Sequence, residues 1–325
     1  MILSEAPSGE RLDGAPTYSI VIPVYASAQF LDELHTRLTA TMDAVGEPYE
    51  IVFVNDDGPD DSLSVLHRLH EADARVVVID LMRNAGQHSA LMAGFSVAAG
   101  RYVVTMDDDL QHPPEEIPRL IAAMATNEAD VVIGRYNTKQ HAGYRNLGSW
   151  AMKALSWYTL GVPRNLDLTS FRLMHRRVVD AVVDFHGPRP RVGLIVFQVT
   201  RRIINVDVEH HPRRKGASSY ALRKLVASAI DNVVNYSALP LRLLAGLGCI
   251  TAAASTLLAV GYIVLYLAGG IAVSGFTTLV LLMLFFMGLT MAAFGIVGEY
   301  MIRIVSAAER RPRYIVREIY RAGRR

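Results

Sequence analysis

The sequence predicts an α/β domain with a mainly parallel sheet, followed by an interfacial amphipathic helix and a hairpin of two transmembrane helices. Short apolar runs alternate with longer helical patterns between residues 18 and 207, as is typical of domains in which strands and helices alternate. Apolar residues at helical spacing indicate an amphipathic helix within residues 218–242. Two later stretches, residues 243–267 and 276–298, contain no Asp, Glu, Lys or Arg, and each is long enough to cross a bilayer.

The α/β domain is expected over residues 18–217, after a flexible N-terminal arm of residues 1–17. Ligands bind at the carboxyl ends of the strands in such sheets. Asp56 and the triplet Asp107 to Asp109 follow two of the apolar runs, so we expect them at the site. The expected strands are residues 18–24, 49–54, 76–81, 102–106 and 131–133, and the expected helices are residues 30–45, 61–72, 87–99 and 115–125.

The two apolar stretches are joined by a short uncharged connection, so we expect them to form a tight hairpin in the membrane. The alternative is a pair of buried helices in a soluble protein. Residues 299–325 form a basic tail with eight arginines and three glutamates. Because positively charged segments stay on the cytoplasmic side, we expect a multi-pass protein of the cell membrane with its α/β domain in the cytoplasm.

Charge and motifs exclude several classes of function. A basic segment beside a membrane attracts anionic lipid headgroups, and no recognition fold accompanies it, so we expect the lipid bilayer and not nucleic acid as a partner. The sequence has neither a GxGxxG after the first expected strand nor a phosphate-binding loop of the Walker type. A dehydrogenase or an ATPase is therefore not favoured.

Three consecutive carboxylates, Asp107, Asp108 and Asp109, come directly after an expected buried strand. Carboxylates that are consecutive in the sequence repel one another, and a bound cation relieves that repulsion. Carboxylate oxygens suit Mg²⁺ or Mn²⁺, which would also neutralise a diphosphate. A solvated acidic turn is the alternative interpretation of such a triplet.

The segment that contains this triplet, Asp-Asp-Asp-Leu-Gln-His-Pro-Pro-Glu at residues 107–115, resembles the DxD motif of family 2 glycosyltransferases. It is most similar to the motif of dolichol-phosphate mannose synthases and bacterial undecaprenyl-phosphate sugar transferases. Residues 83–95 are most similar to the corresponding segment of the transferases that load formamido-arabinose onto undecaprenyl phosphate. Further windows that resemble the same family are residues 21–25, 54–62, 213–220, 240–242, 295–300 and 311–314.

This resemblance implies a GT-A fold and an inverting, metal-dependent transfer. The sugar would move from a nucleotide-diphospho-sugar, first of all a UDP-sugar, to polyprenyl phosphate, in bacteria undecaprenyl phosphate, at the cytoplasmic face of the membrane. Small residues such as Gly246 and Gly248 in the first span favour homo-oligomers, and similar bacterial enzymes suggest a tetramer.

The resemblance also assigns roles to residues. Pro23, Tyr25 and Asp56 would face the nucleotide, together with Asp107 and Asp108. The metal would be held by Asp107, Asp109 and Gln111, of which Asp109 also counts as catalytic; Arg213 and Ser218 would bind the phosphate of the acceptor.

Residues 165–173 resemble a segment that lines the reaction centre in the family. We hypothesise that Asp167 orients the sugar or the acceptor and that Arg172 neutralises phosphate as a second catalytic residue. A helix cap and a surface arginine are the alternatives. Four histidines in or beside the motifs could contact phosphate or metal, although a bystander role is the alternative for each: His88, His112, His210 and His211.

Two other functions stay open. Ala26 and Ser27 stand where the family has Asn and Glu, which favours a catalytically inactive scaffold or nucleotide-binding module. A processive polysaccharide synthase is the other alternative, but the sequence lacks the Q-x-x-R-W motif of that class.

Overall fold

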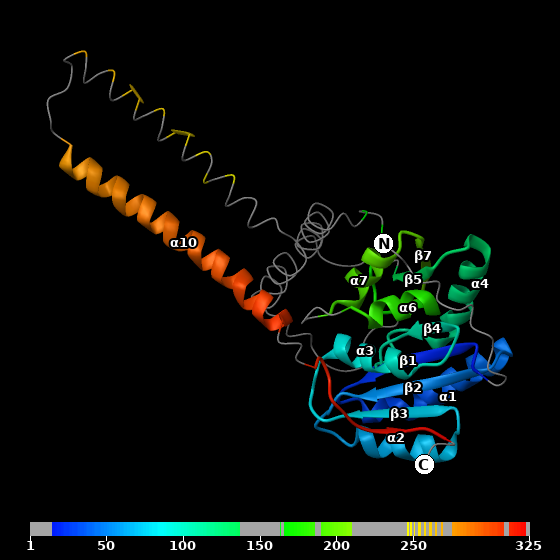
Figure 1. Cartoon of the computed structure of the whole chain (residues 1–325). Coiled ribbons are helices and arrows are strands. Elements are labelled where there is room, and N and C mark those ends of the chain that lie inside the picture. Colours follow the sequence, from blue (N-terminus) through cyan, green and yellow to red (C-terminus); the bar gives the residue numbers. More distant parts are fainter. Residues whose placement is uncertain are drawn as a thin grey trace. The chain divides into compact units, whose positions relative to one another are not determined.

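The computed structural model of the chain describes residues 15–136, 163, 166–185, 190–209, 275–308 and 312–322, with scattered positions between 246 and 268 (Figure 1). Contacts divide the chain into two units. One unit holds the α/β domain together with residues 312–325, and the other holds the long helix α10 (Phe276–Ala308).

The α/β unit is built on one mixed sheet of eight strands in the order β7-β5-β6-β4-β1-β2-β3-β8. Among these strands only β6 and β8 run antiparallel to their neighbours, so the expected mainly parallel sheet is confirmed. The strands are β1 (Tyr18–Val24), β2 (Tyr49–Asn55), β3 (Val76–Leu81), β4 (Tyr102–Thr105), β5 (Val131–Tyr136), β6 (Arg172–His175), β7 (Ile203–Val208) and β8 (Val316–Tyr320).

Helices cover both faces of this sheet because its strands are apolar on both sides, as in other parallel sheets. Alternate residues of β1 show this division. Ile20 and Ile22 belong to one buried cluster with residues of α1, α2 and α4, whereas Val21 belongs to a second cluster with residues of α3, α6 and α7. The helices are α1 (Ala28–Val45), α2 (Ser62–Ala72), α3 (Gln87–Val97), α4 (Ile117–Asn127), α6 (Arg176–Val183) and α7 (Val192–Val199), with a 3-10 turn η1 (Pro114–Glu116) before α4.

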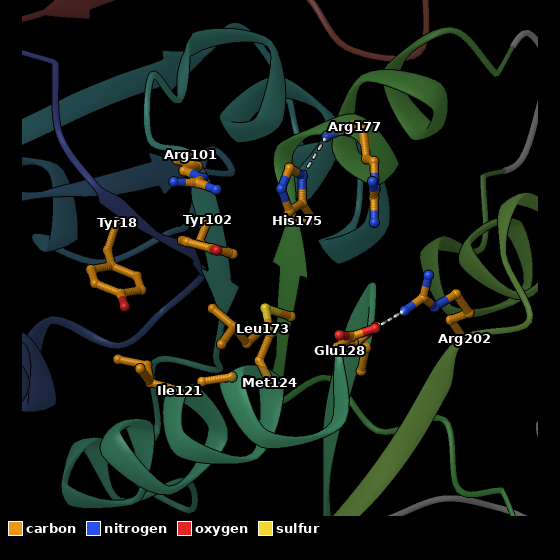
Figure 2. A pocket seen from close by; sticks show the side chains of 12 residues that line it. Tyr18, Arg101, Tyr102, Ile121, Met124, Glu128, Leu173, His175, Arg177 and Arg202 are labelled. Atoms are coloured by element: carbon orange, nitrogen blue, oxygen red, sulfur yellow. Dashed lines mark hydrogen bonds and ion pairs between the residues drawn. The ribbon is translucent and has the colours of Figure 1, made fainter. Parts of the chain in front are cut away.

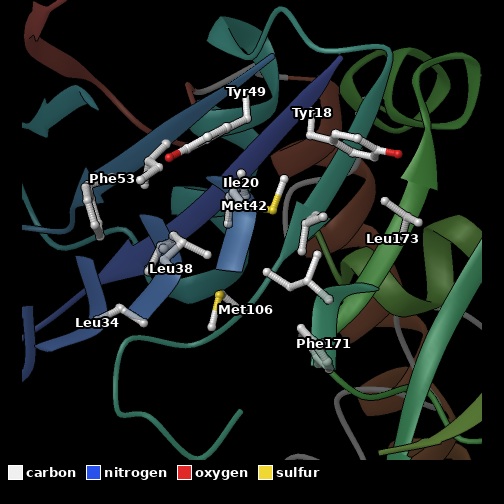
Figure 3. Packing of buried hydrophobic residues seen from close by; sticks show 14 of the residues in the cluster. Tyr18, Ile20, Leu34, Leu38, Met42, Tyr49, Phe53, Met106, Phe171 and Leu173 are labelled. Atoms are coloured by element: carbon white, nitrogen blue, oxygen red, sulfur yellow. The ribbon is translucent and has the colours of Figure 1, made fainter. Parts of the chain in front are cut away.

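The first cluster is the larger core. Leu34, Leu38 and Met42 of α1 are fully buried and pack onto Ile20 and Phe53 of the sheet (Figure 3). These α1 residues recur at intervals of four, so they lie on one face of the helix. This packing fixes β1 and β2, whose carboxyl ends carry the candidate site.

All five expected strands and all four expected helices are present, each with an end shifted by no more than a few residues. Three strands and two helices were not expected. Of these, β8 is the most informative, because it lies within residues 299–325, which were expected to form a basic tail. Figure 1 shows it beside β3, where it forms the antiparallel edge of the sheet. The interpretation of this stretch as a tail is therefore incomplete: local charge does not reveal a pairing with a strand so distant in sequence.

Helix α10 has a stretch, Phe285–Ile302, with a mean hydropathy of 1.6 and no buried residues in its unit. Among the described residues it is the one helix long and apolar enough to cross a membrane. Helix α10 includes residues 276–298, the second expected span, and continues to Ala308. The amphipathic helix at residues 218–242 lies outside the described residues, and residues 243–267 are described only at scattered positions. The hairpin therefore stays a prediction.

Candidate active site

Polar residues follow β1, β2 and β4 at the end of the sheet where the carboxyl ends of these strands lie. The register of the parallel pairs brings these ends together, since Val24 lies beside Asn55 and Val21 beside Thr105. The loops beyond them enclose a cavity of about 330 Å³. Its lining includes all five residues expected to face the nucleotide, together with Asp109; the full lining is Pro23, Val24, Tyr25, Asp56, Asn84, Gly86, Gln87, Asp107, Asp108 and Asp109.

Asp56 connects the end of β2 to the start of α3. Its carboxylate accepts hydrogen bonds from the backbone N–H of Ala85 at 2.7 Å and of Gly86 at 2.9 Å. Asp56 is buried, and this burial raises the pKa of its carboxyl group despite the two backbone donors. Gly86 has φ of 83°, a left-handed conformation that favours glycine. The loop before α3 is thus fixed to the sheet by one side chain.

Asp107 accepts two side-chain hydrogen bonds. The Nε2 of Gln87 lies 2.6 Å from its Oδ1, and the Oγ of Ser170 lies 2.8 Å from its Oδ2. Asp109 accepts hydrogen bonds from the side-chain amide and the backbone N–H of Gln111. Gln111, expected as a metal ligand, does not line the cavity but holds Asp109 in place.

Asp108, the middle carboxylate, ties the triplet to β1. Its Oδ2 accepts a hydrogen bond from the backbone N–H of Tyr25 at 3.0 Å. Burial is the main reason that the pKa of Asp108 is raised to about 6; the charges of Asp107 and Asp109 add to this shift, and the hydrogen bonds of its carboxylate oppose it. Three non-glycine residues next to the cavity, Ala26, Asp57 and Leu110, have φ between 53° and 60°. Such left-handed conformations are costly and cluster at functional sites.

The carboxylates of Asp107 and Asp109 provide the hard oxygen donors that a divalent cation requires. Within the described part of the chain, no group of three or more His, Cys, Asp or Glu side chains is placed to hold a metal ion. The two carboxylates suit Mg²⁺ or Mn²⁺, and Mg²⁺ in particular is bound by one or two carboxylates and completes its coordination with substrate phosphates and water.

Arg172 begins β6 and lies beside this triplet. Its side chain is only 3% exposed, and its Nη2 donates to the backbone carbonyl of Thr169. Its Nε and Nη1 have no hydrogen-bond partner among the described residues. Burial lowers the pKa of Arg172 to about 10, so the guanidinium stays charged at neutral pH. The alternative interpretation as a surface arginine is therefore wrong.

His88, in the first turn of α3, has a buried Nδ1 that also lacks a partner among the described residues. Burial is the main reason that the pKa of His88 is lowered to about 4, and the charges of Arg172 and Arg191 contribute to the same shift. His88 is thus a neutral imidazole at pH 7. His112 has a different place: its Nδ1 accepts a hydrogen bond from the backbone N–H of Asp107 at 3.2 Å, and its ring stacks on Phe171. This packing role contrasts with the expected contact with metal.

Asp167 lies outside the residues that line the cavity. Its backbone N–H donates to Oδ1 of Asn205 at 2.8 Å, and its carbonyl accepts from Nδ2 of Asn205 at 3.0 Å. Asn205 belongs to β7, so Asp167 is anchored to the edge strand that lies farther from β1 in the sheet. Four candidates for contact with phosphate or metal lie outside the described residues: His210, His211, Arg213 and Ser218.

Gln87 and Ser170, the two side-chain donors to Asp107, were not predicted as site residues. Both belong to segments that resemble the family, residues 83–95 and 165–173, but the motifs alone do not indicate which side chain turns toward the triplet. Only the packing of α3 and of the segment before β6 brings them to Asp107.

A second cavity, of about 340 Å³, lies at the opposite end of the strands, where β1 and β4 begin (Figure 2). Tyr18 and Tyr102 stack there with ring centroids 5.6 Å apart. Two of the arginines that line it are paired: Arg177 contacts Asp130, and Arg202 lies 3.5 Å from Glu128. This cavity is separate from the acidic triplet.

Comparison with known proteins identifies the family of the chain. The profile of Glycosyl transferase family 2 matches residues 19–183. An undecaprenyl-phosphate 4-deoxy-4-formamido-L-arabinose transferase from Proteus mirabilis (strain HI4320) is 36% identical over 93% of each chain. The protein of the same name from Enterobacter sp. (strain 638) is 35% identical over 96% of each chain.

Among solved structures, glucosyl-3-phosphoglycerate synthase from Mycobacterium tuberculosis, in complex with Mn²⁺, UDP and phosphoglyceric acid, has a similar fold. The TM-score is 0.50 at 18% identity, over 68% of this chain and 77% of that chain. This likeness shows a shared GT-A-like fold. The family profile spans half of the sequence, and the two transferases align with nearly all of it. The chain therefore belongs to glycosyl transferase family 2.

Proposed function

We propose that this chain transfers a sugar from a UDP-sugar to undecaprenyl phosphate, with inversion at the anomeric carbon, at the cytoplasmic face of the membrane. The observation that carries the proposal is an acidic triplet at the cavity and, outside the cavity lining, a buried guanidinium that feels the charge of Asp107 and whose Nε and Nη1 lack partners among the described residues. A donor with a diphosphate leaving group and an acceptor with a phosphate are substrates that would use both the acidic triplet and the guanidinium. The names of the two transferases that align with nearly the whole chain support this choice of acceptor.

The nucleotide part of the donor would occupy the cavity between Tyr25, Asp56 and Gly86. A divalent cation held by Asp107 and Asp109, with Gln111 fixing Asp109, would supply charge neutralisation for the diphosphate. Mn²⁺ and UDP bound together in the glucosyl-3-phosphoglycerate synthase structure are consistent with this assignment.

The acceptor needs little help from a general base. The second pKa of a phosphate monoester is about 6, so the attacking phosphate is already largely a dianion at neutral pH. Placement and neutralisation of charge then carry the rate. Arg172 would provide that charge, and Asp167 would act only by orienting the acceptor or the sugar.

The apolar stretch of α10 supports the membrane part of the proposal. A polyprenyl chain stays in the bilayer, so an enzyme that uses its phosphate must lie at the membrane surface. The unburied stretch Phe285–Ile302 is long enough for a span, and eight arginines in residues 299–325 favour the cytoplasmic side for the segments that flank the spans.

The proposal is tested by turnover. The purified chain is incubated with undecaprenyl phosphate, Mn²⁺ or Mg²⁺ and a panel of UDP- and GDP-sugars that includes UDP-4-deoxy-4-formamido-L-arabinose, and glycolipid is detected by mass spectrometry. We expect product from one UDP-sugar, loss of product on chelation, and loss in Asp109→Asn. Asp61→Asn is the matched control, because Asp61 is an exposed acid that does not line the cavity.

The absence of glycolipid with every donor, from a folded protein that still binds UDP, would contradict the proposal. That outcome would favour the catalytically inactive nucleotide-binding module instead.

A further inference from the structure

Strand β8 returns the chain to the sheet after α10 and places an arginine near the nucleotide side of the cavity. Glu318 pairs with Asp80 and Val316 with Leu81, so Arg317 is the extra residue of a β-bulge. A bulge changes the direction of the side chain it contains. The Nη1 of Arg317 lies 2.8 Å from Oδ2 of Asp80.

Asp80 is buried, with 2% of its surface exposed. Its second oxygen, Oδ1, accepts a hydrogen bond from Nδ2 of Asn55 at 2.8 Å. One buried carboxylate thus connects Arg317 of β8 to Asn55, the last residue of β2. Arg317 also reaches the loop after β2 directly, because its Nη2 lies 3.8 Å from Oδ1 of Asp57.

Asn55 immediately precedes Asp56, which lines the cavity and holds the backbone of Ala85 and Gly86. We propose that Arg317 is a positioning residue for nucleotide binding, which acts through Asp80 and Asn55 on Asp56 and through Asp57 on the loop beyond it. The inference rests on the proposed function, because it takes this cavity as the nucleotide site.

The same strand contains a matched control. Arg321 forms an ion pair with Glu50, a buried carboxylate that also accepts hydrogen bonds from Ser19 and Ala99. Glu50 lies near the start of β2, whereas Asn55 lies at its end. Arg317 and Arg321 therefore each neutralise a buried acid of the central sheet, but only Arg317 does so beside the cavity.

The experiment compares Arg317→Met, Arg317→Lys and Arg321→Met in the full chain, purified in detergent. Calorimetry with UDP and Mn²⁺ gives the affinity, the thermal midpoint without ligand gives the stability, and turnover gives KM and kcat for the donor. We expect Arg317→Met to weaken UDP binding by about tenfold, similar to the lower end of the effect of losing an outer-shell partner at a metal site. KM for the donor should rise while kcat changes little.

Both methionine variants should lower the thermal midpoint, because each leaves a buried carboxylate without its cation. Arg321→Met should nevertheless bind UDP like the wild type, and Arg317→Lys should recover part of the affinity, because its ammonium can still pair with Asp80. Wild-type affinity in Arg317→Met, or equal weakening in Arg321→Met, would overturn the inference while leaving the proposed function intact. A wild-type chain that binds no UDP would overturn both.

Discussion

Several ionisable side chains at the candidate active site are buried deeply enough to have altered pKa values. Burial raises the pKa of Asp56 and brings that of Asp108 to about 6, and it lowers the pKa of His88 to about 4. Burial disfavours the charged form of each group, so it costs free energy of folding at neutral pH for the two carboxyl groups and only below pH 6.5 for His88. Such a concentration of shifted groups at one edge of a sheet is typical of a functional site.

The unpartnered atoms of Arg172 lead to a prediction about turnover. Replacing Arg172 with Met should lower kcat by about a hundredfold, the usual cost of losing one group that stabilises charge in the transition state. Arg172→Lys should recover only part of this, because an ammonium does not reproduce the donors of a guanidinium. Arg119→Met, which changes an exposed arginine of α4, is the control. Equal kcat for Arg172→Met and the control would exclude Arg172 from the reaction.

His88 leads to a prediction about stability. Its pKa in the folded chain is below the ordinary 6.5, so the unfolded chain binds the extra proton first. The stability from neutral His88 is therefore fully present above pH 6.5 and is lost as the pH falls toward 4, with a cost of about 2 kcal/mol at pH 5. His88→Asn has no such group, so its thermal midpoint should fall less than that of the wild type between pH 7.5 and pH 5. Parallel pH profiles for the two proteins would contradict the assignment.

Residue patterns predicted one part of the site better than the other. The family resemblance assigned Pro23, Tyr25 and Asp56 to the nucleotide, and all three line the cavity because they stand at or just after the carboxyl ends of β1 and β2. The burial of Arg172 could not be predicted, because it depends on β6 entering the sheet between β4 and β5. The donors to Asp107 come from elements that meet only in the folded chain.

At the scale of elements, the contact between α3 and the sheet is unusually close. A Cβ added to Gly94 would lie 2.3 Å from Cγ1 of Val21 on β1 and 3.2 Å from Cγ2 of Val54 on β2. Helix α3 carries Gln87 and His88 in its first turn, so the spacing between helix and sheet also sets the position of these side chains at the cavity.

We therefore expect Gly94→Ala to destabilise the protein by about 1–3 kcal/mol, the usual cost of overpacking a core. Val21→Ala should relieve the clash, so the double variant should be more stable than the sum of the two single effects implies. Thermal midpoints of the four proteins form a double-mutant cycle that measures this coupling. Additive effects would show that α3 shifts away from β1 at little cost.

The elements that could be predicted were those with local patterns. Strands β1 to β4 are continuous apolar runs between helical patterns, and each was expected from its own residues. Strand β8 has charged residues at Arg317 and Glu318, which hide its apolar positions Val316 and Ile319. Its partner β3 precedes it by more than two hundred residues, so no local pattern indicates the pairing.

At the scale of the whole molecule, the apolar surface of α10 leads to a prediction about membrane association. Phe294 is exposed in the stretch Phe285–Ile302. An arginine near the centre of a membrane helix costs about 3 kcal/mol, so Phe294→Arg should reduce the share of protein that stays with membranes after an alkaline wash. Phe294→Leu, which keeps the apolar surface, should remain with the membranes. Equal recovery of both variants in the soluble fraction would contradict a membrane span at this helix.

The position of β8 also has a consequence for biosynthesis. Because β8 lies after α10 in the sequence and pairs with β3, the ribosome must translate the apolar helix before the sheet can gain its eighth strand. Until then β3 presents an unpaired edge, which can pair with other chains. Nascent chains that stall within α10 would therefore need protection by a chaperone, although seven of the eight strands had already been made.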